Sequence, residues 1–325
     1  MALLRVIVVL AAALLALQGG ALAQAGKVFR VGLVAVGAPD TGVLGPGMVH
    51  NFTQRGYVDG QTIAFERRAA QGKLDRLPGF IEELVAAHVD VIITAGYPAA
   101  IAAKERAGKT PIVVIGSGDP VATGLVASLA HPGGNITGVS EVATELTAKR
   151  LALLKEALLS ARDVAVLWNA DDFGMSLRYQ AAEVEAKRLN MRIMPLGVHA
   201  PDDFDTAFSE MTKTPPDGIL MVTDILTNLN RGRVMQYADE HRLPAIYEYA
   251  RFAHDGGLMS YGPDESAILD RAAGLADRIL KGAKPGDLPL ELPTRFQFAI
   301  NLKTAKAIGL TIPEAILLRA DDVIE

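Results

Sequence analysis

The sequence predicts an α/β protein with two doubly wound parallel-sheet lobes that are joined by a hinge. Short runs of β-branched residues alternate with longer amphipathic segments, which is the order of parallel strands joined by helices. The alternation stops at a Pro- and Gly-rich break at residues 132–135 and then starts again. A chain of 325 residues is also long enough for two hydrophobic cores.

The first half begins with its clearest strand, residues 28–36 (VFRVGLVAV), which is rich in β-branched and apolar residues. Residues 61–68 place Ile63 and Phe65 between polar neighbours, so they indicate a second strand. Further strands are expected at 89–94 and 111–115, and helices at 48–55, 74–87, 98–106 and 119–129.

The second half repeats this rhythm after the break. Strands are expected at 164–168, 192–196, 218–222, 244–247 and 257–261, and helices at 146–159, 177–189, 204–211, 229–241 and 267–280. The end is irregular, with extended segments at 288–292 and 296–300 and a short helix at 302–308. We therefore expect an N-terminal lobe at 27–138, completed by part of 257–285, and a C-terminal lobe at 139–256. Residues 286–325 would form a C-terminal segment that packs across the lobes.

The first 23 residues have the features of a secretory signal peptide. A weakly basic start precedes an unbroken apolar run of 12 residues at 6–17, and Ala21-Leu22-Ala23 offers a small-x-small cleavage site before Gln24. The run is much shorter than the roughly 20 residues of a membrane span, so we expect no span after cleavage. Because the sequence has no cysteine, it cannot carry a lipoprotein anchor. We expect the mature chain in the periplasm of a Gram-negative bacterium.

Composition excludes several classes of function. The chain has 32 Lys and Arg against 37 Asp and Glu, and this balance argues against nucleic-acid binding, which depends on neutralising phosphates. No Gly-x-Gly-x-x-Gly motif follows the first strand and no Gly-x-Ser-x-Gly motif occurs. The six His residues are scattered without metal-ligand spacing. We therefore expect no catalytic residue, no cofactor and no metal, and we do not expect an enzyme.

Ligand contacts are expected at the carboxyl ends of the strands, because ligands of open parallel sheets bind there. Two lobes would bring two such edges face to face across a cleft. The candidate ligand-binding residues in these loops are Gly37, Thr41, Gly96, Tyr97, Pro98, Ser117, Asp119, Asn169, Asp224 and Tyr247.

The loop at residues 95–98 is the most informative of these. Gly96 permits a tight turn and Pro98 suits the first turn of a helix, whose free N–H groups could hold a carboxylate. Tyr97 could stack on a ligand or hydrogen-bond to it. The alternative is an ordinary strand-to-helix turn with Tyr97 packed at the surface.

The acidic and amide candidates each have two interpretations. Asp119 and Asp224 could pair with a ligand ammonium group, or each could cap the helix that follows it. Asn169 could donate to a ligand and accept from it, or serve as a turn residue.

Several segments together resemble one known family. They are residues 56–61 (GYVDGQ), 119–121 (DPV), 124–129 (GLVASL), 132–138 (PGGNITG), 164–169 (VAVLWN), 256–262 (GGLMSYG) and 301–310 (NLKTAKAIGL). In this order they resemble the ABC transporter substrate-binding proteins of the tryptophan/tyrosine-uptake type, which have a type I periplasmic-binding fold. The likeness runs over nearly all of residues 28–325.

The resemblance implies a receptor whose two lobes close on a small ligand and deliver it to an inner-membrane ABC permease. The ligand would be an amino acid or a small apolar or aromatic carboxylate, and a monomer would suffice for delivery. Relatives often have Thr in place of Tyr97, so the ligand does not follow from the family alone. The alternative is a ligand-sensing periplasmic receptor that docks on a membrane sensor kinase, because the fold is the same.

Overall fold

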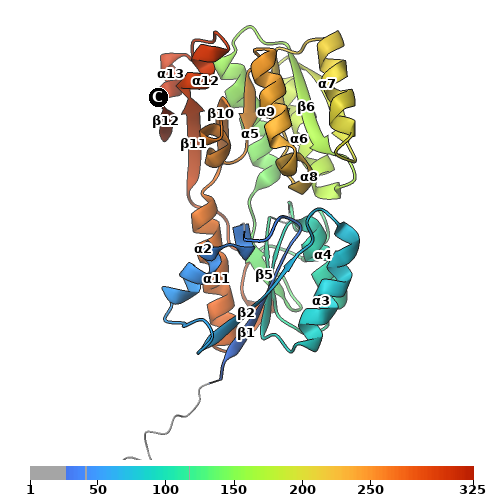
Figure 1. Cartoon of the computed structure of the whole chain (residues 1–325), viewed down its shortest axis with the longest axis vertical. Helices are drawn as coiled ribbons and strands as arrows, with labels where there is room; N and C mark the ends of the chain where they lie inside the picture. The colour runs from blue at the N-terminus through green and yellow to red at the C-terminus, as the bar shows by residue number, and fades with distance from the viewer. Residues whose placement is uncertain (1–26, 41, 117) are drawn as a thin grey trace, which may run out of the picture.

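The computed structural model describes residues 27–40, 42–116 and 118–325. The expected signal peptide, Thr41 and Ser117 lie outside these residues. The described chain forms two α/β lobes, which confirms the predicted fold class (Figure 1). We call the lobe built on strands β1 to β5 the first lobe, at the bottom of Figure 1, and the other the second lobe.

The first lobe contains a five-stranded sheet of order β2-β1-β3-β4-β5, in which every neighbouring pair is parallel. Its strands are β1 (Phe29–Ala35), β2 (Ile63–Ala69), β3 (Val91–Ala95), β4 (Ile112–Ile115) and β5 (Ile136–Val139). Its helices are α2 (Pro46–Thr53), α3 (Leu77–Ala86), α4 (Tyr97–Arg106) and α11 (Glu265–Leu280), with short 3-10 turns η1 (Gly42–Leu44), η2 (Leu74–Arg76) and η3 (Pro285–Asp287).

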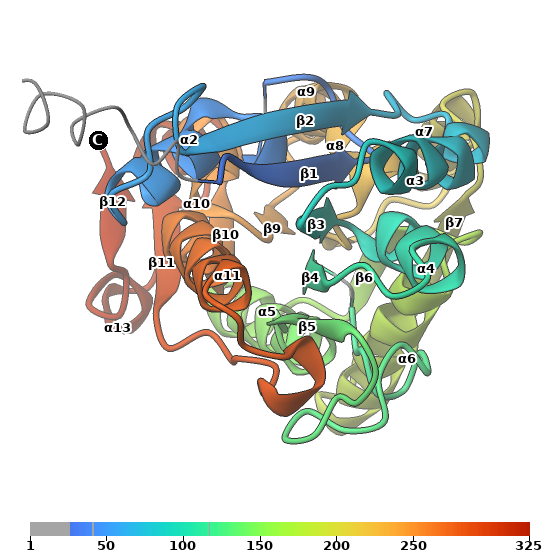
Figure 2. The same cartoon turned by 90° about the horizontal axis from the view of Figure 1, so that it is seen from below.

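Helices cover both faces of this sheet, as the continuous apolar runs of its strands predict. Helices α2 and α11 lie on one face, and α3 and α4 lie on the other (Figure 2). Strand β1 shows the consequence for single residues. Leu33 faces the core under α2 and α11, whereas its neighbour Val34 faces the core under α3 and α4, and both are fully buried.

The second lobe contains a seven-stranded sheet of order β12-β11-β10-β9-β8-β6-β7. Its strands are β6 (Asp163–Asn169), β7 (Arg192–Val198), β8 (Gly218–Met221), β9 (Ala245–Tyr247), β10 (Met259–Pro263), β11 (Phe296–Asn301) and β12 (Asp322–Ile324). Its helices are α5 (Ala143–Ala157), α6 (Phe173–Arg188), α7 (Asp203–Lys213), α8 (Ile225–Leu229), α9 (Arg231–Glu240), α10 (Ala250–His254), α12 (Leu302–Ala307) and α13 (Glu314–Leu317). All pairs are parallel except β10 with β11, which is antiparallel.

The described chain passes between the lobes at 140–142, at Asp264 and at 292–295. These segments lie together, because Ser140 N–H donates to the carbonyl of Glu291 at 2.9 Å and Asp264 N–H donates to the carbonyl of Arg295 at 3.1 Å. Helix α11 follows a strand of the second lobe but packs against α2 and the first sheet. The adjacent crossings form the hinge between the lobes.

Some expected elements differ from the structure. Residues 119–129 form turns instead of a helix, and Gly124 adopts a left-handed φ of +69° that interrupts helical geometry. Residues 288–292 add only an isolated bridge at Glu291. The expected helix at 229–241 is α9, whereas α8, which ends at Leu229, was not predicted, and neither were α10, α13 and β12.

Strand β5 was also missed, because it is short and contains Gly138. That glycine has a packing reason: a Cβ atom there would lie 2.2 Å from the carbonyl oxygen of Val114. The first sheet therefore has five strands where four were expected. Within the described part of the chain, no helix is both long and apolar enough to span a membrane.

Candidate functional site

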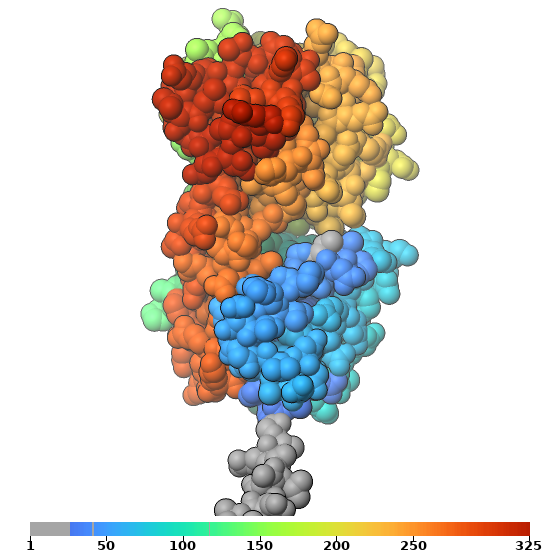
Figure 3. Space-filling view, turned by 60° about the vertical axis from the view of Figure 1, so that its left-hand side comes forward, coloured from blue at the N-terminus to red at the C-terminus, as the bar shows by residue number. Residues whose placement is uncertain are grey.

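The carboxyl ends of strands from both sheets meet where the lobes touch. A Cβ atom built on Gly118 would lie 3.5 Å from the Cα of Gly174, and one built on Gly174 would lie 3.9 Å from the Cβ of Tyr97. Figure 3 shows the lobes meeting at a waist, with blue first-lobe residues below yellow second-lobe residues. We call this region the interlobe site.

The first lobe presents the beginning of α4 to the interlobe site. Gly96 precedes the helix with a φ of +93°, and no side chain caps the helix there. The N–H of Gly96 is already used, because it donates to the carbonyl of Ile115 at 2.9 Å. Pro98 lies in the first turn, as predicted from its fixed φ. The uncapped first turn therefore points its positive end at the second lobe.

Tyr97 lies half-buried at this junction, beside the start of α6. Burial raises the pKa of its hydroxyl, and the nearby carboxylates of Asp172 and Glu105 raise it further. The hydroxyl therefore stays protonated at neutral pH and can donate a hydrogen bond. Gly37 lies at the end of the neighbouring strand β1, where its carbonyl accepts from Gln71.

On the second lobe, Asn169 and Asp224 are brought together. The Nδ2 of Asn169 donates to the Oδ2 of Asp224 at 2.6 Å. Asp224 also caps α8, because its Oδ1 accepts from the N–H of Thr227 at 2.9 Å. Asp224 therefore caps the helix that follows it, which is one of the two alternatives. It also lies at the interlobe site, but both of its carboxylate oxygens already accept hydrogen bonds.

Asp172 is a further carboxylate at the interlobe site. It is buried and caps α6 by accepting from the N–H of Met175 at 3.2 Å. Burial raises its pKa to about 6, and the charge of Asp224 adds to the effect.

Beneath the site, two arginines share one buried glutamate. Nη2 of Arg150 lies 3.0 Å from Oε1 of Glu248, and Nη2 of Arg178 lies 2.6 Å from Oε2. Burial by itself raises the pKa of Glu248, but the two guanidinium groups outweigh burial and hold it below its ordinary value. Arg178 also donates to the carbonyl of Thr223, and Arg150 donates to the carbonyl of Tyr261. Both arginines are buried and donate hydrogen bonds to backbone carbonyls of the second lobe.

Glu141 and Tyr249 complete the site, and the sequence analysis missed both. Glu141 is 8% exposed, and its Oε1 accepts from the Tyr249 hydroxyl at 3.2 Å. Burial raises the pKa of Glu141 to about 7, and the charge of Glu248 adds to this, although Arg178 opposes it. Glu141 lies two residues after the end of β5, so recognising that strand would have nominated it by the same carboxyl-end rule.

Two of the candidate ligand-binding residues, Asp119 and Tyr247, have structural roles. Asp119 accepts from the N–H groups of Val121 and Ala122 at 3.1 and 3.0 Å. It therefore caps the backbone that follows it, as one alternative predicted, but that backbone is a turn and not a helix. Tyr247 is a correction: it is 1% exposed and packs in the core of the second lobe with Phe252. Side chains alternate along a strand, so the residue after Tyr247, Glu248, reaches the other side.

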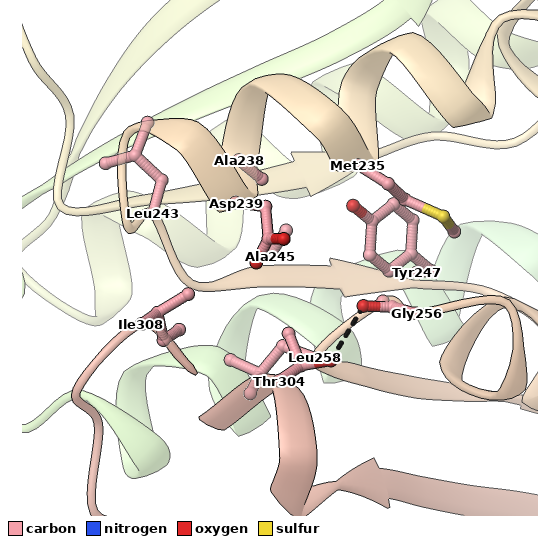
Figure 4. A pocket seen from close by; sticks show the side chains of 11 residues that line it. Met235, Ala238, Asp239, Leu243, Ala245, Tyr247, Gly256, Leu258, Thr304 and Ile308 are labelled. Atoms are coloured by element: carbon pink, nitrogen blue, oxygen red, sulfur yellow. Dashed lines mark hydrogen bonds between the residues drawn. The ribbon is translucent and has the colours of Figure 1, made fainter. Parts of the chain in front are cut away.

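The small cavity in Figure 4 is also remote from the interlobe site. It lies between β9, α9 and α12, with Tyr247 and Met235 in its wall. Its volume is about 10 Å³, which is room for one water molecule at most. Among the described residues, no group of three or more His, Cys, Asp or Glu side chains could hold a metal ion.

Comparison with known proteins gives a family match over most of the chain. The model of a family described as "ABC transporter substrate binding protein" matches residues 34–324. A curated protein of Clostridioides difficile (strain R20291), described as "Tyrosine-binding protein", is 26% identical over 264 residues, which cover 81% of this chain and 76% of that protein.

Solved structures of similar fold cover almost the whole chain. A conserved domain protein of Vibrio cholerae has a TM-score of 0.85 at 23% identity and covers 91% of this chain and 100% of its own. A domain of Streptococcus pneumoniae in complex with L-Trp has a TM-score of 0.85 at 22% identity and covers 92% and 100%. The ligand-free, open structure of a Clostridium difficile substrate binding protein has a TM-score of 0.65 at 22% identity, and covers 92% and 99%.

Proposed function

Because the chain belongs to the ABC transporter substrate-binding protein family, we propose that it captures an amino acid in the interlobe site and delivers it to an ABC permease. The observation that carries this proposal is the charge arrangement of the site. The uncapped start of α4 on the first lobe is positive, Asp172 and Asp224 on the second lobe are negative, and Glu141 adds a buried carboxylate beside the start of α4. A free amino acid carries both complementary charges.

Aromatic amino acids fit this site best. Tyr97 and Tyr249 contribute rings and hydroxyl groups to it, from opposite lobes. The hydroxyl of Thr223, next to Asp224, is buried and has no hydrogen-bond partner among the described residues. The names of two relatives support the same class, since one is a tyrosine-binding protein and another holds L-Trp. We propose Gly37, Gly96, Tyr97, Pro98, Asn169 and Asp224 as ligand-facing residues.

The mechanism would be capture followed by closure at the hinge. A ligand that contacts both lobes favours the closed state by the difference between its affinities for the closed and open states. The placement of α11 on the first lobe and of β11 on the second supports the proposed lobes and a C-terminal segment that touches both.

We further propose that the chain acts as a monomer in the periplasm, after cleavage behind Ala23, and that it performs no chemistry on its ligand. The family match favours delivery to a permease over docking on a sensor kinase.

A thermal-shift screen tests the amino-acid ligand. The protein would be unfolded and refolded to remove carried-over ligand, then heated with millimolar L-tyrosine, L-tryptophan, other amino acids, and aromatic or branched carboxylates without an amine. A ligand at 1,000 times its Kd adds about 4 kcal/mol to the free energy of unfolding, a shift of several degrees. Stabilisation by the amine-free acids but by no amino acid would contradict the proposal.

A further inference from the structure

One buried residue at the interlobe site, Glu141, has a carboxylate oxygen that accepts no hydrogen bond from the described part of the chain. Glu141 is more than nine-tenths buried, and its Oε1 accepts from Tyr249. Its Oε2 accepts no hydrogen bond from any residue that the structure describes, and Glu141 forms no ion pair with any of them. A buried carboxylate in this condition is costly unless a donor reaches it.

The free oxygen points towards the place where a ligand would lie. A Cβ atom built on Gly116 would be 3.4 Å from the Oε2 of Glu141 and 3.6 Å from the backbone nitrogen of Gly96. The carboxylate thus faces the glycine-lined ends of β3 and β4, next to the start of α4. If the start of α4 holds the ligand carboxylate, the ligand atoms bonded next to that carboxylate would lie within reach of Glu141.

The charged groups around Glu141 leave it unneutralised. Glu248 lies nearby and raises its pKa, and Arg178 lowers it, but Arg178 is already paired with Glu248. Glu265 also raises its pKa and is itself paired with Arg251. The remaining neighbour is the neutral hydroxyl of Tyr249, whose pKa is raised well above its ordinary value by burial and by these carboxylates.

We propose that Glu141 receives the primary ammonium group of the ligand and so makes the amine a condition of tight binding. This inference rests on the proposed amino-acid function and adds a specificity-determining residue to it. The ammonium would donate to Oε2 while Tyr249 keeps its bond to Oε1. Asp119 and Asp224, the sequence candidates for this role, already accept from backbone groups.

Calorimetric titration of matched ligands tests the assignment. L-tyrosine and 3-(4-hydroxyphenyl)propanoate differ only in the amine, and L-tryptophan and 3-(indol-3-yl)propanoate form a second pair. We expect the wild type to prefer each amine by about 100-fold or more, because the amine-free ligand leaves Glu141 unpaired. Glu141→Gln keeps the shape and should weaken amino-acid binding about 100-fold, while binding of the propanoates changes less than about threefold.

Glu145→Gln is the matched control, because Glu145 is an exposed carboxylate one turn further along, on α5. It should bind both ligands of each pair as the wild type does.

The pH dependence of the wild type gives a second readout that needs no variant. An ionised Glu141 binds the ammonium and a protonated one does not, so affinity should fall as the pH drops through about 7. Between pH 7.5 and 5.5 the Kd for L-tyrosine should rise about 20-fold, with proton release on binding at the lower pH. The propanoates should lack this dependence.

Two failures can be told apart. If the wild type binds amino acids and Glu141→Gln binds them equally well, or if the wild type does not distinguish the members of each pair, the assignment of Glu141 is wrong and the amino-acid function stands. If the wild type binds no amino acid, the proposed function is wrong and the assignment falls with it. Should the variant not fold, the wild-type ligand pairs and pH series decide alone.

Discussion

Tyr97 is the residue that places an aromatic ring of the first lobe directly at the junction. Its ring lies against the start of α6, and its hydroxyl is held neutral by burial and by Asp172. We expect Tyr97→Ala to raise the Kd for L-tyrosine about tenfold or more, by loss of ring contact, with little change in melting temperature. Tyr97→Phe separates the ring from the hydroxyl. Unchanged affinity for both variants in calorimetry would make Tyr97 an ordinary turn residue.

Glu141 also links ligand binding to stability. Its pKa rises from an ordinary 4.5 to about 7 in the folded state, so folding takes up a proton between these values. Stability from this group is complete below pH 4.5 and is lost as the pH rises through 7. The loss is on the order of 3 kcal/mol. In urea denaturation of ligand-free protein at pH 8, Glu141→Gln should therefore be the more stable chain; a less stable variant would contradict this sign.

Among the elements, α11 depends most clearly on its N-cap residue, Asp264, which lies at a crossing between the lobes. Asp264 accepts from the N–H groups of Ser266 and Ala267 at 3.0 and 3.2 Å, and it pairs with Arg295. Asp264→Ala should lower the free energy of unfolding by about 1–2 kcal/mol. The control is Asp202→Ala, since Asp202 precedes α7 without a side-chain cap and is exposed. Equal effects of the two variants in thermal unfolding would show that the cap is unimportant.

At the scale of the whole molecule, an apolar contact of α8 helps to hold the two lobes together. Ile225, on α8 of the second lobe, packs against the core of the first lobe under α3 and α4. Ile225→Ala should remove about 1–2 kcal/mol of apolar contact from the closed state only. Ligand affinity should then fall about tenfold, because the closed state is less populated.

Small-angle scattering of the saturated and ligand-free forms checks this expectation. The ligand-free Ile225→Ala protein should have the larger radius of gyration relative to the wild type. Val184→Ala, an exposed site on α6, should match the wild type in both affinity and scattering. If Ile225→Ala binds as tightly as the wild type, α8 does not contribute to closure.

Most of the fold was predictable because the spacing of apolar residues along a segment indicates which of its faces are buried. The run at 28–36 became β1, buried on both faces, and Gly96 with Pro98 opened a helix as expected. Prediction failed where the local pattern was too short or ambiguous. Strand β5 has four residues and one of them is Gly138, while 119–129 contains helix-compatible residues that Asp119 and Gly124 fold into turns.

The sequence by itself determined the two-lobed α/β class and the family, and it predicted the edge of each sheet as the place for a ligand. Only the tertiary structure decided which side chains meet there. Glu141 and Tyr249 are 108 residues apart: Glu141 lies in a crossing between the lobes, and Tyr249 precedes α10 of the second lobe. Asp119 accepts from the turn that follows it, and Asp224 accepts from Thr227 and Asn169. The physical reason is that periodicity measures burial along one segment, but a carboxylate becomes a binding group only when distant elements bury it and leave it without a partner.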